Sequence, residues 1–142
     1  MADVKLILAP YLNFNGNAGE AMKFYQSILG GELAMQTFGE AGVPHEPREK
    51  DRIIHAALKR GDLLLMASDG HLGRKVIIGD NIRLSVTGSK SGELTEIFNG
   101  LAEGGRVEMP MAKQFWGETM GMVVDRFGVH EFKYMKFIKR DS

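Results

Sequence analysis

The sequence of 142 residues contains no cysteine, only four prolines and no excess of either charge. The missing cysteine excludes a disulfide scaffold, a thiolate zinc site and a cysteine nucleophile. The 18 Lys and Arg residues equal the 18 Asp and Glu residues, whereas a dedicated nucleic-acid-binding protein usually carries a basic excess. No apolar run approaches the roughly 18 residues of a membrane span. We therefore expect a single cytoplasmic domain over residues 1–142 that binds neither nucleic acid nor membrane.

Two segments have the spacing of amphipathic helices, and each ends at a pair of glycines. Asn17 and Glu20 have the spacing of a helix N-cap and its return partner. Gly30-Gly31 and Gly104-Gly105 are typical helix stops. The apolar residues that recur at steps of three and four before these stops are Ala21, Phe24, Tyr25, Ile28 and Leu29 in the first segment and Leu94, Ile97, Phe98 and Leu101 in the second.

The two halves of the sequence predict the same order of elements. Each reads strand, helix, glycine pair, strand, loop, strand, turn and strand, and the opening run to Pro10 also reads as a strand. An offset of 74 residues superimposes the glycine pairs. We therefore predict an α+β fold of two tandem βαβββ units, about 1–70 and 79–142. Together they would form a curved mixed sheet, or half-barrel, around a cleft with the helices outside.

Several motifs resemble one known family over nearly the whole chain. They are Tyr11-Leu12-Asn13-Phe14-Asn15-Gly16-Asn17, Leu65-Met66-Ala67-Ser68-Asp69, Phe115-Trp116-Gly117 and Asp125-Arg126-Phe127-Gly128-Val129. The chain is similar to the PhnB-like branch of the vicinal oxygen chelate superfamily, which includes glyoxalase I, extradiol dioxygenases and bleomycin-resistance proteins. This resemblance implies the fold and a homodimer, but one fold hosts many chemistries.

Members of this branch are often labelled ubiquinone methyltransferase-like. No Gly-x-Gly-x-x-Gly follows a strand and opens a helix here, so we do not expect a methyltransferase of the usual S-adenosylmethionine type.

The resemblance also implies where a divalent metal would be held. Three of the metal-ligand positions fall on Pro10, Asn81 and Phe132. The fourth falls in Leu63–Ser68, where the available side chains are Met66 and Ser68. None of these side chains is an imidazole or a carboxylate, the preferred ligands of catalytic metals in this superfamily. We therefore predict no metal and no other cofactor.

Six side chains are candidates for a ligand pocket, each with a structural alternative. Asn13 and Asn81 can donate and accept hydrogen bonds to an oxygen-rich ligand. His55 would be an acid or base in the pocket, or a hydrogen-bonded structural histidine on a strand. Met66 would line a pliable pocket or fill the core. Phe115 and Trp116 would form a pocket wall or a core plug beneath their loop.

Three functions remain open, and the sequence assigns no catalytic residue. The first is binding of a small apolar or oxygenated molecule without a catalytic metal. The alternative is a metal-dependent lyase, isomerase or dioxygenase with Asn81, Glu131 and His55 as substituted ligands. The third is an interaction protein that uses the basic, apolar tail Lys133–Ser142. We favour the first.

Overall fold

The computed structural model describes residues 5–135, without the side chains of residues 132, 134 and 135. The chain divides into two compact units, 1–76 and 77–142. Unit 1 contains β1 (Tyr11–Asn13), α1 (Ala18–Leu29), β2 (Glu32–Thr37), α2 (Phe38–Ala41), the 3₁₀ turn η1 (Pro47–Glu49), β3 (Ile53–Arg60) and β4 (Leu63–Ser68). Unit 2 contains β5 (Leu84–Gly88), α3 (Ser91–Ala102), β6 (Arg106–Lys113), β7 (Thr119–Val124) and β8 (His130–Met135).

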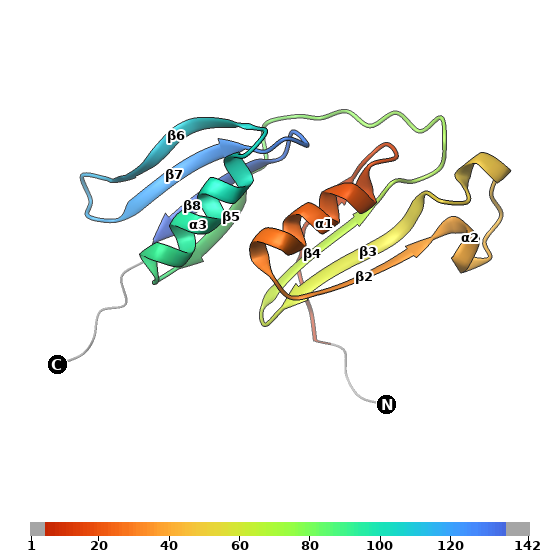
Figure 1. Ribbon diagram of the computed structural model, residues 1–142, viewed down its shortest axis with the longest axis horizontal. Helices are drawn as coiled ribbons and strands as arrows, with labels where there is room; N and C mark the ends of the chain where they lie inside the picture. Colours follow the sequence, from red (N-terminus) through yellow and green to blue (C-terminus); the bar gives the residue numbers. More distant parts are fainter. Residues whose placement is uncertain (1–4, 136–142) are drawn as a thin grey trace. The chain divides into compact units, whose positions relative to one another are not determined.

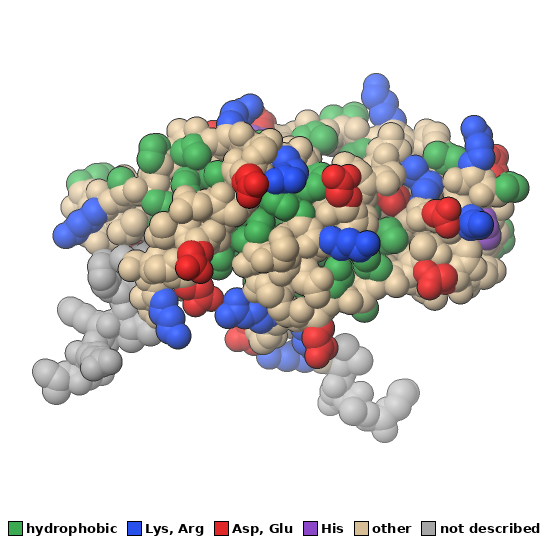
Figure 2. Space-filling model, viewed as in Figure 1, with side chains coloured by type: hydrophobic (Ala, Val, Ile, Leu, Met, Phe, Trp, Pro, Cys, Tyr) green, Lys and Arg blue, Asp and Glu red, His purple; other side chains and the backbone are tan. Residues whose placement is uncertain are grey.

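The two units have the same sheet topology (Figure 1). Unit 1 forms a four-stranded sheet in the order β1-β4-β3-β2, in which β1 runs parallel to β4 and the other neighbours are antiparallel. Unit 2 repeats this as β5-β8-β7-β6, again with one parallel pair, β5 and β8. The predicted α+β class and the repeated βαβββ order are therefore confirmed. On the face shown in Figure 2, Lys and Arg side chains are interspersed with Asp and Glu side chains.

One long helix packs along each sheet, as Figure 1 shows for α1 and α3. Full burial of each large apolar side chain contributes roughly 1.5–3 kcal/mol, so these contacts form the core of each unit. The longest described helices have 12 residues each, and no helix within residues 5–135 is long and apolar enough to cross a membrane. The buried helical residues are Ala18, Ala21, Met22, Tyr25 and Leu29 in α1 and Leu94, Ile97, Phe98 and Leu101 in α3.

The glycine pairs that end these helices meet two separate steric requirements. The first glycine supplies a left-handed backbone, with φ of 74° at Gly30 and 76° at Gly104. The second allows close packing against the following hairpin. A Cβ on Gly31 would lie 2.6 Å from the carbonyl oxygen of Lys59, and a Cβ on Gly105 would collide with the backbone in the same way. Only glycine satisfies both requirements.

An arginine side chain donates hydrogen bonds to a carbonyl oxygen at the C-terminal end of each 12-residue helix. Arg60, in the β3–β4 hairpin, donates to the carbonyl oxygen of Leu29 at 2.8 Å. Arg126, in the β7–β8 hairpin, donates to the carbonyl oxygen of Glu103 at 3.1 and 3.2 Å. Cations favour the negative end of a helix dipole, so both arginines satisfy carbonyl groups that a helix leaves unpaired.

The start of α1 differs from the sequence prediction. The side chain of Asn17 makes no capping hydrogen bond, so the predicted capping box with Glu20 is wrong. The carboxylate of Asp69 takes its place, because Oδ1 accepts the N–H groups of Gly16 and Ala18, each at 2.9 Å. A cap supplied from a distant strand leaves no local pattern in the sequence.

The strand predicted for the opening apolar run also differs from the structure. The first strand covers only Tyr11–Asn13, and among the described residues before it Leu6 and Leu8 are almost completely exposed. Pro10 lacks an N–H group and so cannot donate to a strand ladder, although its carbonyl oxygen accepts the N–H of Met66 at 3.1 Å.

Candidate functional site

The sheet of unit 1 has one face covered by α1 and one face without a helix. On β3 and β4, Ala56, Leu58, Leu65 and Ala67 are buried beneath α1. Side chains alternate between the faces of a strand, so their neighbours point to the uncovered face. We call this the open face of unit 1. Asn13, His55, Met66 and Tyr11 lie on it.

A tyrosine and a histidine are joined at the centre of this open face. Tyr11 is the register partner of Met66 on β4, which in turn pairs with Ala57 on β3. His55 lies two residues before Ala57 and therefore on the same face. Its Nδ1 is 3.1 Å from the Tyr11 hydroxyl, and the two ring centroids are 5.8 Å apart. A hydroxyl, an imidazole and a thioether are thus brought to one small area of sheet.

Asn13 extends this group along β1. It pairs in register with Ser68 and is exposed, whereas the Ser68 side chain is buried and accepts the N–H of Gly70 at 3.1 Å. The amide of Asn13 can both donate and accept a hydrogen bond. The open face of unit 1 therefore offers polar groups of both kinds beside apolar surface.

The other candidates from the sequence belong to unit 2. Asn81 is exposed in the segment before β5. Phe115 and Trp116 lie in the turn between β6 and β7, where Phe115 is 97% exposed and Trp116 is 45% exposed. Their rings meet edge to face with centroids 4.7 Å apart. They are not the buried plug that the structural alternative predicted.

Unit 2 also has an open face, and it carries charges that the sequence did not indicate. His130 pairs with Val124, which pairs with Arg106, so all three share the face opposite α3. Glu108 lies beside them. Its Oε2 accepts a hydrogen bond from Arg83 at 2.6 Å, and its Oε1 accepts one from Arg106 at 3.4 Å. The hydrogen bond from Arg83 holds the pKa of Glu108 below its ordinary value.

The opposite face of the same strands contains a buried pair of charged residues. Glu131 and Lys133 pair with Val123 and Gly121, and a Cβ on Gly121 would contact Phe98 of α3. Lys133 is 0% exposed and Glu131 is 3% exposed. Burial raises the pKa of the Glu131 carboxyl and lowers the pKa of the Lys133 amine.

A metal of the kind expected for the superfamily does not fit the residues at its positions. Pro10 has no donor side chain, Asn81 is a single exposed amide, and Glu131 faces α3. The Phe132 side chain lies outside the described part of the structure. Within residues 5–135 no three His, Asp or Glu side chains form a group that could hold a metal ion.

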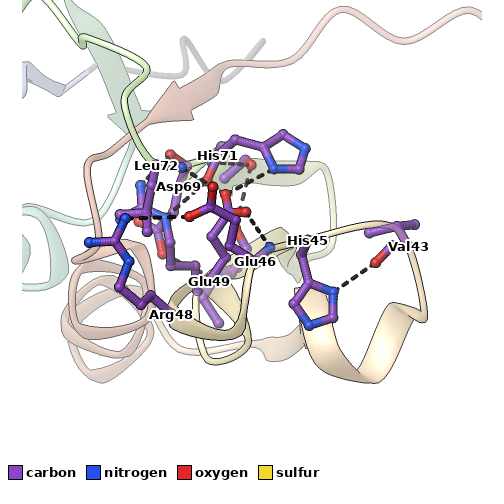
Figure 3. Close-up of polar contacts among 12 residues, drawn as sticks. Val43, His45, Glu46, Arg48, Glu49, Asp69, His71 and Leu72 are labelled. Atoms are coloured by element: carbon purple, nitrogen blue, oxygen red, sulfur yellow. Dashed lines mark hydrogen bonds and ion pairs between the residues drawn. The ribbon is translucent and has the colours of Figure 1, made fainter.

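A third polar cluster joins two loops of unit 1 (Figure 3). The carboxylate of Glu49 is buried and accepts the N–H groups of Glu46 and Leu72, each at 2.8 Å, and the Nδ1–H of His71 at 2.9 Å. The two backbone donors lower the pKa of Glu49 to about 2. The His71 ring also lies against Phe38, with centroids 4.7 Å apart. The partners of the Glu49 carboxylate among the described residues all belong to these two loops, so the cluster fixes the loops to each other.

The comparisons with known proteins agree with this architecture. Residues 7–131 match the family described as 3-demethylubiquinone-9 3-methyltransferase. The chain belongs to this family. It is 29% identical over 134 residues to Protein YjdN of Escherichia coli K12, a match that covers 86% of this chain and 90% of that protein. The predicted resemblance to the PhnB-like branch is therefore confirmed.

Solved structures of similar proteins share the fold. Protein PA1353 from Pseudomonas aeruginosa is 41% identical and has a TM-score of 0.84, covering 93% of this chain and 98% of that one. The PhnB protein from Bacillus cereus, described as a putative 3-demethylubiquinone-9 3-methyltransferase, is 24% identical with a TM-score of 0.75, over 91% and 98% of the two chains. A glyoxalase/bleomycin resistance protein/dioxygenase family enzyme from Burkholderia phytofirmans PsJN is 12% identical and has a TM-score of 0.58. The match covers 89% of this chain and 97% of that one.

The family name mentions a methyltransferase, but the sheets are not of the doubly wound parallel type. Within residues 5–135 the only parallel strand pairs are β1 with β4 and β5 with β8, so neither unit forms a doubly wound parallel sheet. The fold is that of the glyoxalase/bleomycin-resistance superfamily.

Proposed function

We propose that this member of the 3-demethylubiquinone-9 3-methyltransferase family binds a small apolar or oxygenated molecule on its open sheet faces, without a catalytic metal. The observation that carries the proposal is the hydrogen-bonded pair of Tyr11 and His55 on the open face of unit 1. Both side chains are exposed. The hydrogen bond between them uses one polar site on each side chain, and a hydroxyl and an imidazole each offer more than one.

The composition of this face suits a ligand with an apolar body and few oxygens. Met66 and Ala57 supply apolar surface, and Met adapts its shape to different partners. The Tyr11 hydroxyl, the Nε2 atom of His55 and the Asn13 amide supply directed polar contacts. Ligand sites commonly combine a mostly apolar lining with a small number of such groups.

The proposal can be tested by measuring binding of n-octanol, n-octanoate and n-octyl phosphate to the purified protein by calorimetry, together with elemental analysis. We expect at least one of the three to bind, without stoichiometric Zn, Ni, Mn or Fe. Tyr11→Phe and His55→Ala should each weaken octanol binding by about tenfold, which corresponds to roughly 1.4 kcal/mol.

His45→Ala is the matched control, because His45 is an exposed loop histidine whose Nδ1 bonds to the carbonyl oxygen of Val43 at 2.7 Å. It should bind like the unmodified protein. Failure of all three compounds to bind, or a tightly held metal at one equivalent, would overturn the proposal and favour the metal-dependent alternative in the second case.

A further inference from the structure

Two guanidinium groups and an imidazole converge on one carboxylate on the open face of unit 2. Glu108 is bonded to Arg83 and Arg106, and its Oε1 lies 3.7 Å from Nδ1 of His130. The side chains of Arg83, Glu108 and His130 are 32%, 23% and 10% exposed. The site is therefore partly screened from water, where charged hydrogen bonds are stronger than at a fully exposed surface.

The cluster has more hydrogen-bond donors than acceptors. A guanidinium carries five N–H donors. Within the described residues the side chains of Arg83 and Arg106 each make one hydrogen bond, in both cases to Glu108. The Nδ1 atom of His130 is buried, and among those residues it has no hydrogen-bond partner, because 3.7 Å is too long for one. A single carboxylate thus leaves the remaining donors and a net positive charge uncompensated.

This surplus is not explained by stability alone. An exposed ion pair contributes about 0–1 kcal/mol, and one arginine is enough to neutralise one glutamate. A second arginine on the same carboxylate adds little, and placing a nearly buried histidine beside both adds a cost if its donor stays unpaired. Guanidinium groups do, however, bind carboxylate and phosphate oxygens through two parallel hydrogen bonds.

The surface next to the cluster combines hydroxyls with thioethers. Ser85 and Thr87 lie on the open face of β5, which begins directly after Arg83, and their hydroxyls are 3.3 Å apart. Met122 and Met109 are register partners on β7 and β6. A molecule held by Arg83 would therefore meet polar groups along one edge and apolar surface in the middle of the sheet.

We propose that Arg83, Arg106 and His130 form a subsite for an oxyanion, the carboxylate or phosphate head of a small amphiphilic ligand whose apolar part lies over the methionines. Glu108 is a positioning residue that orients Arg83. This inference rests on the proposal that the open sheet faces bind small molecules, and it assigns a ligand with an anionic head to the open face of unit 2.

The test compares n-octanoate, n-octyl phosphate, n-octanol and inorganic phosphate as probes of the full chain, by calorimetry at low salt. We expect octanoate or octyl phosphate to bind at least about tenfold more tightly than octanol, as an additional charged hydrogen bond would provide. Arg83→Gln should remove this advantage by weakening the binding of the two octyl anions. Arg83→Lys, which keeps the charge but loses the planar fork, should retain part of it.

Arg48→Gln is the matched control, since Arg48 is an arginine of unit 1 that is 80% exposed and pairs with Glu46 at 3.3 Å. It should leave all affinities unchanged, and thermal melting should show that every variant is folded. Equal binding of the octyl anions and octanol, or unchanged anion binding by Arg83→Gln, would overturn the subsite and leave the proposed function intact.

Inorganic phosphate binding as tightly as octyl phosphate would overturn the amphiphilic part of the proposal. Absence of binding by every octyl compound would overturn both this inference and the proposed function.

Discussion

The Oδ1 atom of Asp69 lies 2.9 Å from the backbone nitrogen of Ala18, which stands 51 positions earlier in the sequence. The same oxygen accepts the N–H of Gly16, and Oδ2 accepts the N–H of Ile53 at 2.9 Å. One carboxylate therefore connects the end of β4 to the first turn of α1 and to the start of β3. Because Asp69 is only 3% exposed, water cannot replace these contacts.

Replacing Asp69 should strongly destabilise unit 1. Asp69→Ala leaves three backbone N–H groups without their acceptor, and we expect it to lower the free energy of unfolding by about 2–5 kcal/mol. Asp69→Asn keeps one acceptor oxygen and should cost less. Urea unfolding followed by circular dichroism measures both. Asp62→Ala, at an exposed aspartate in the β3–β4 turn, is the control; an equal loss in both alanine variants would contradict this prediction.

The two glycines that end α1 should respond differently to alanine. Gly30→Ala places a side chain at φ 74° but meets nothing within 4 Å, so it should cost about 1–2 kcal/mol. Gly31→Ala adds a collision with the Lys59 carbonyl oxygen to a similar backbone strain, and overpacking costs typically about 1–3 kcal/mol more. Thermal and urea unfolding of the two variants provide the comparison. A smaller effect at Gly31 than at Gly30 would show that the close approach of helix end and hairpin is unimportant.

Acid should remove the contribution of Glu49 to stability. Its folded-state pKa is about 2 and its ordinary value is 4.5, so the ionised carboxylate stabilises the fold at pH above 4.5. That contribution decreases as the pH falls from 4.5 towards 2. The stability difference between the unmodified protein and Glu49→Gln should therefore be constant at pH 5–7 and shrink below pH 4.5. Glu96→Gln, at an exposed position of α3, is the control. A difference that stays constant down to pH 3 would contradict the assignment.

Removing the buried charges beneath α3 should not harm unit 2. Within the described residues Oε2 of Glu131 and Nζ of Lys133 are buried without a hydrogen-bond partner, so replacing both side chains by apolar ones of similar size removes a desolvation cost. We expect the double variant Glu131→Leu/Lys133→Met to unfold at the same or a higher temperature than the unmodified protein. Differential scanning calorimetry measures this. A clear fall in melting temperature would indicate that the pair is specifically required for the packing of β8.

Local sequence patterns predicted those features that depend on neighbouring residues. The apolar spacing of Leu94, Ile97, Phe98 and Leu101 identified the buried side of α3, and Gly30-Gly31 marked the end of α1. These signals work because a helical face and a left-handed residue are determined by short segments.

Features that depend on distant residues were not predicted. Nothing near Asn17 shows that Asp69 replaces it as the cap, and nothing near His55 shows that Tyr11 is its partner. Glu108 and Arg83 stand apart in the sequence and become neighbours only through strand pairing. The alternation of Ile82, Leu84 and Val86 predicted a strand over Asn81–Val86, which in the structure covers Leu84–Gly88, but it did not show which charged residue Arg83 would meet.

The predicted ligand pocket remains a hypothesis. Asn13, His55 and Met66 lie on one sheet face of unit 1, whereas Asn81, Phe115 and Trp116 belong to unit 2. The expected role of the tail concerns residues that mostly lie outside the described range, although Lys133 within it is buried beneath α3.

The distance in sequence between α1 and Asp69 has a consequence for synthesis on the ribosome. At about 5–20 residues per second, the start of the helix leaves the ribosome roughly 3–10 s before the carboxylate that completes its first turn. During that time the nascent helix is uncapped and its apolar side has no sheet to cover. Unit 1 can therefore complete its fold only after β4 and Asp69 have been synthesised. A translational pause before that point would prolong the exposure of the apolar side of α1, which favours aggregation.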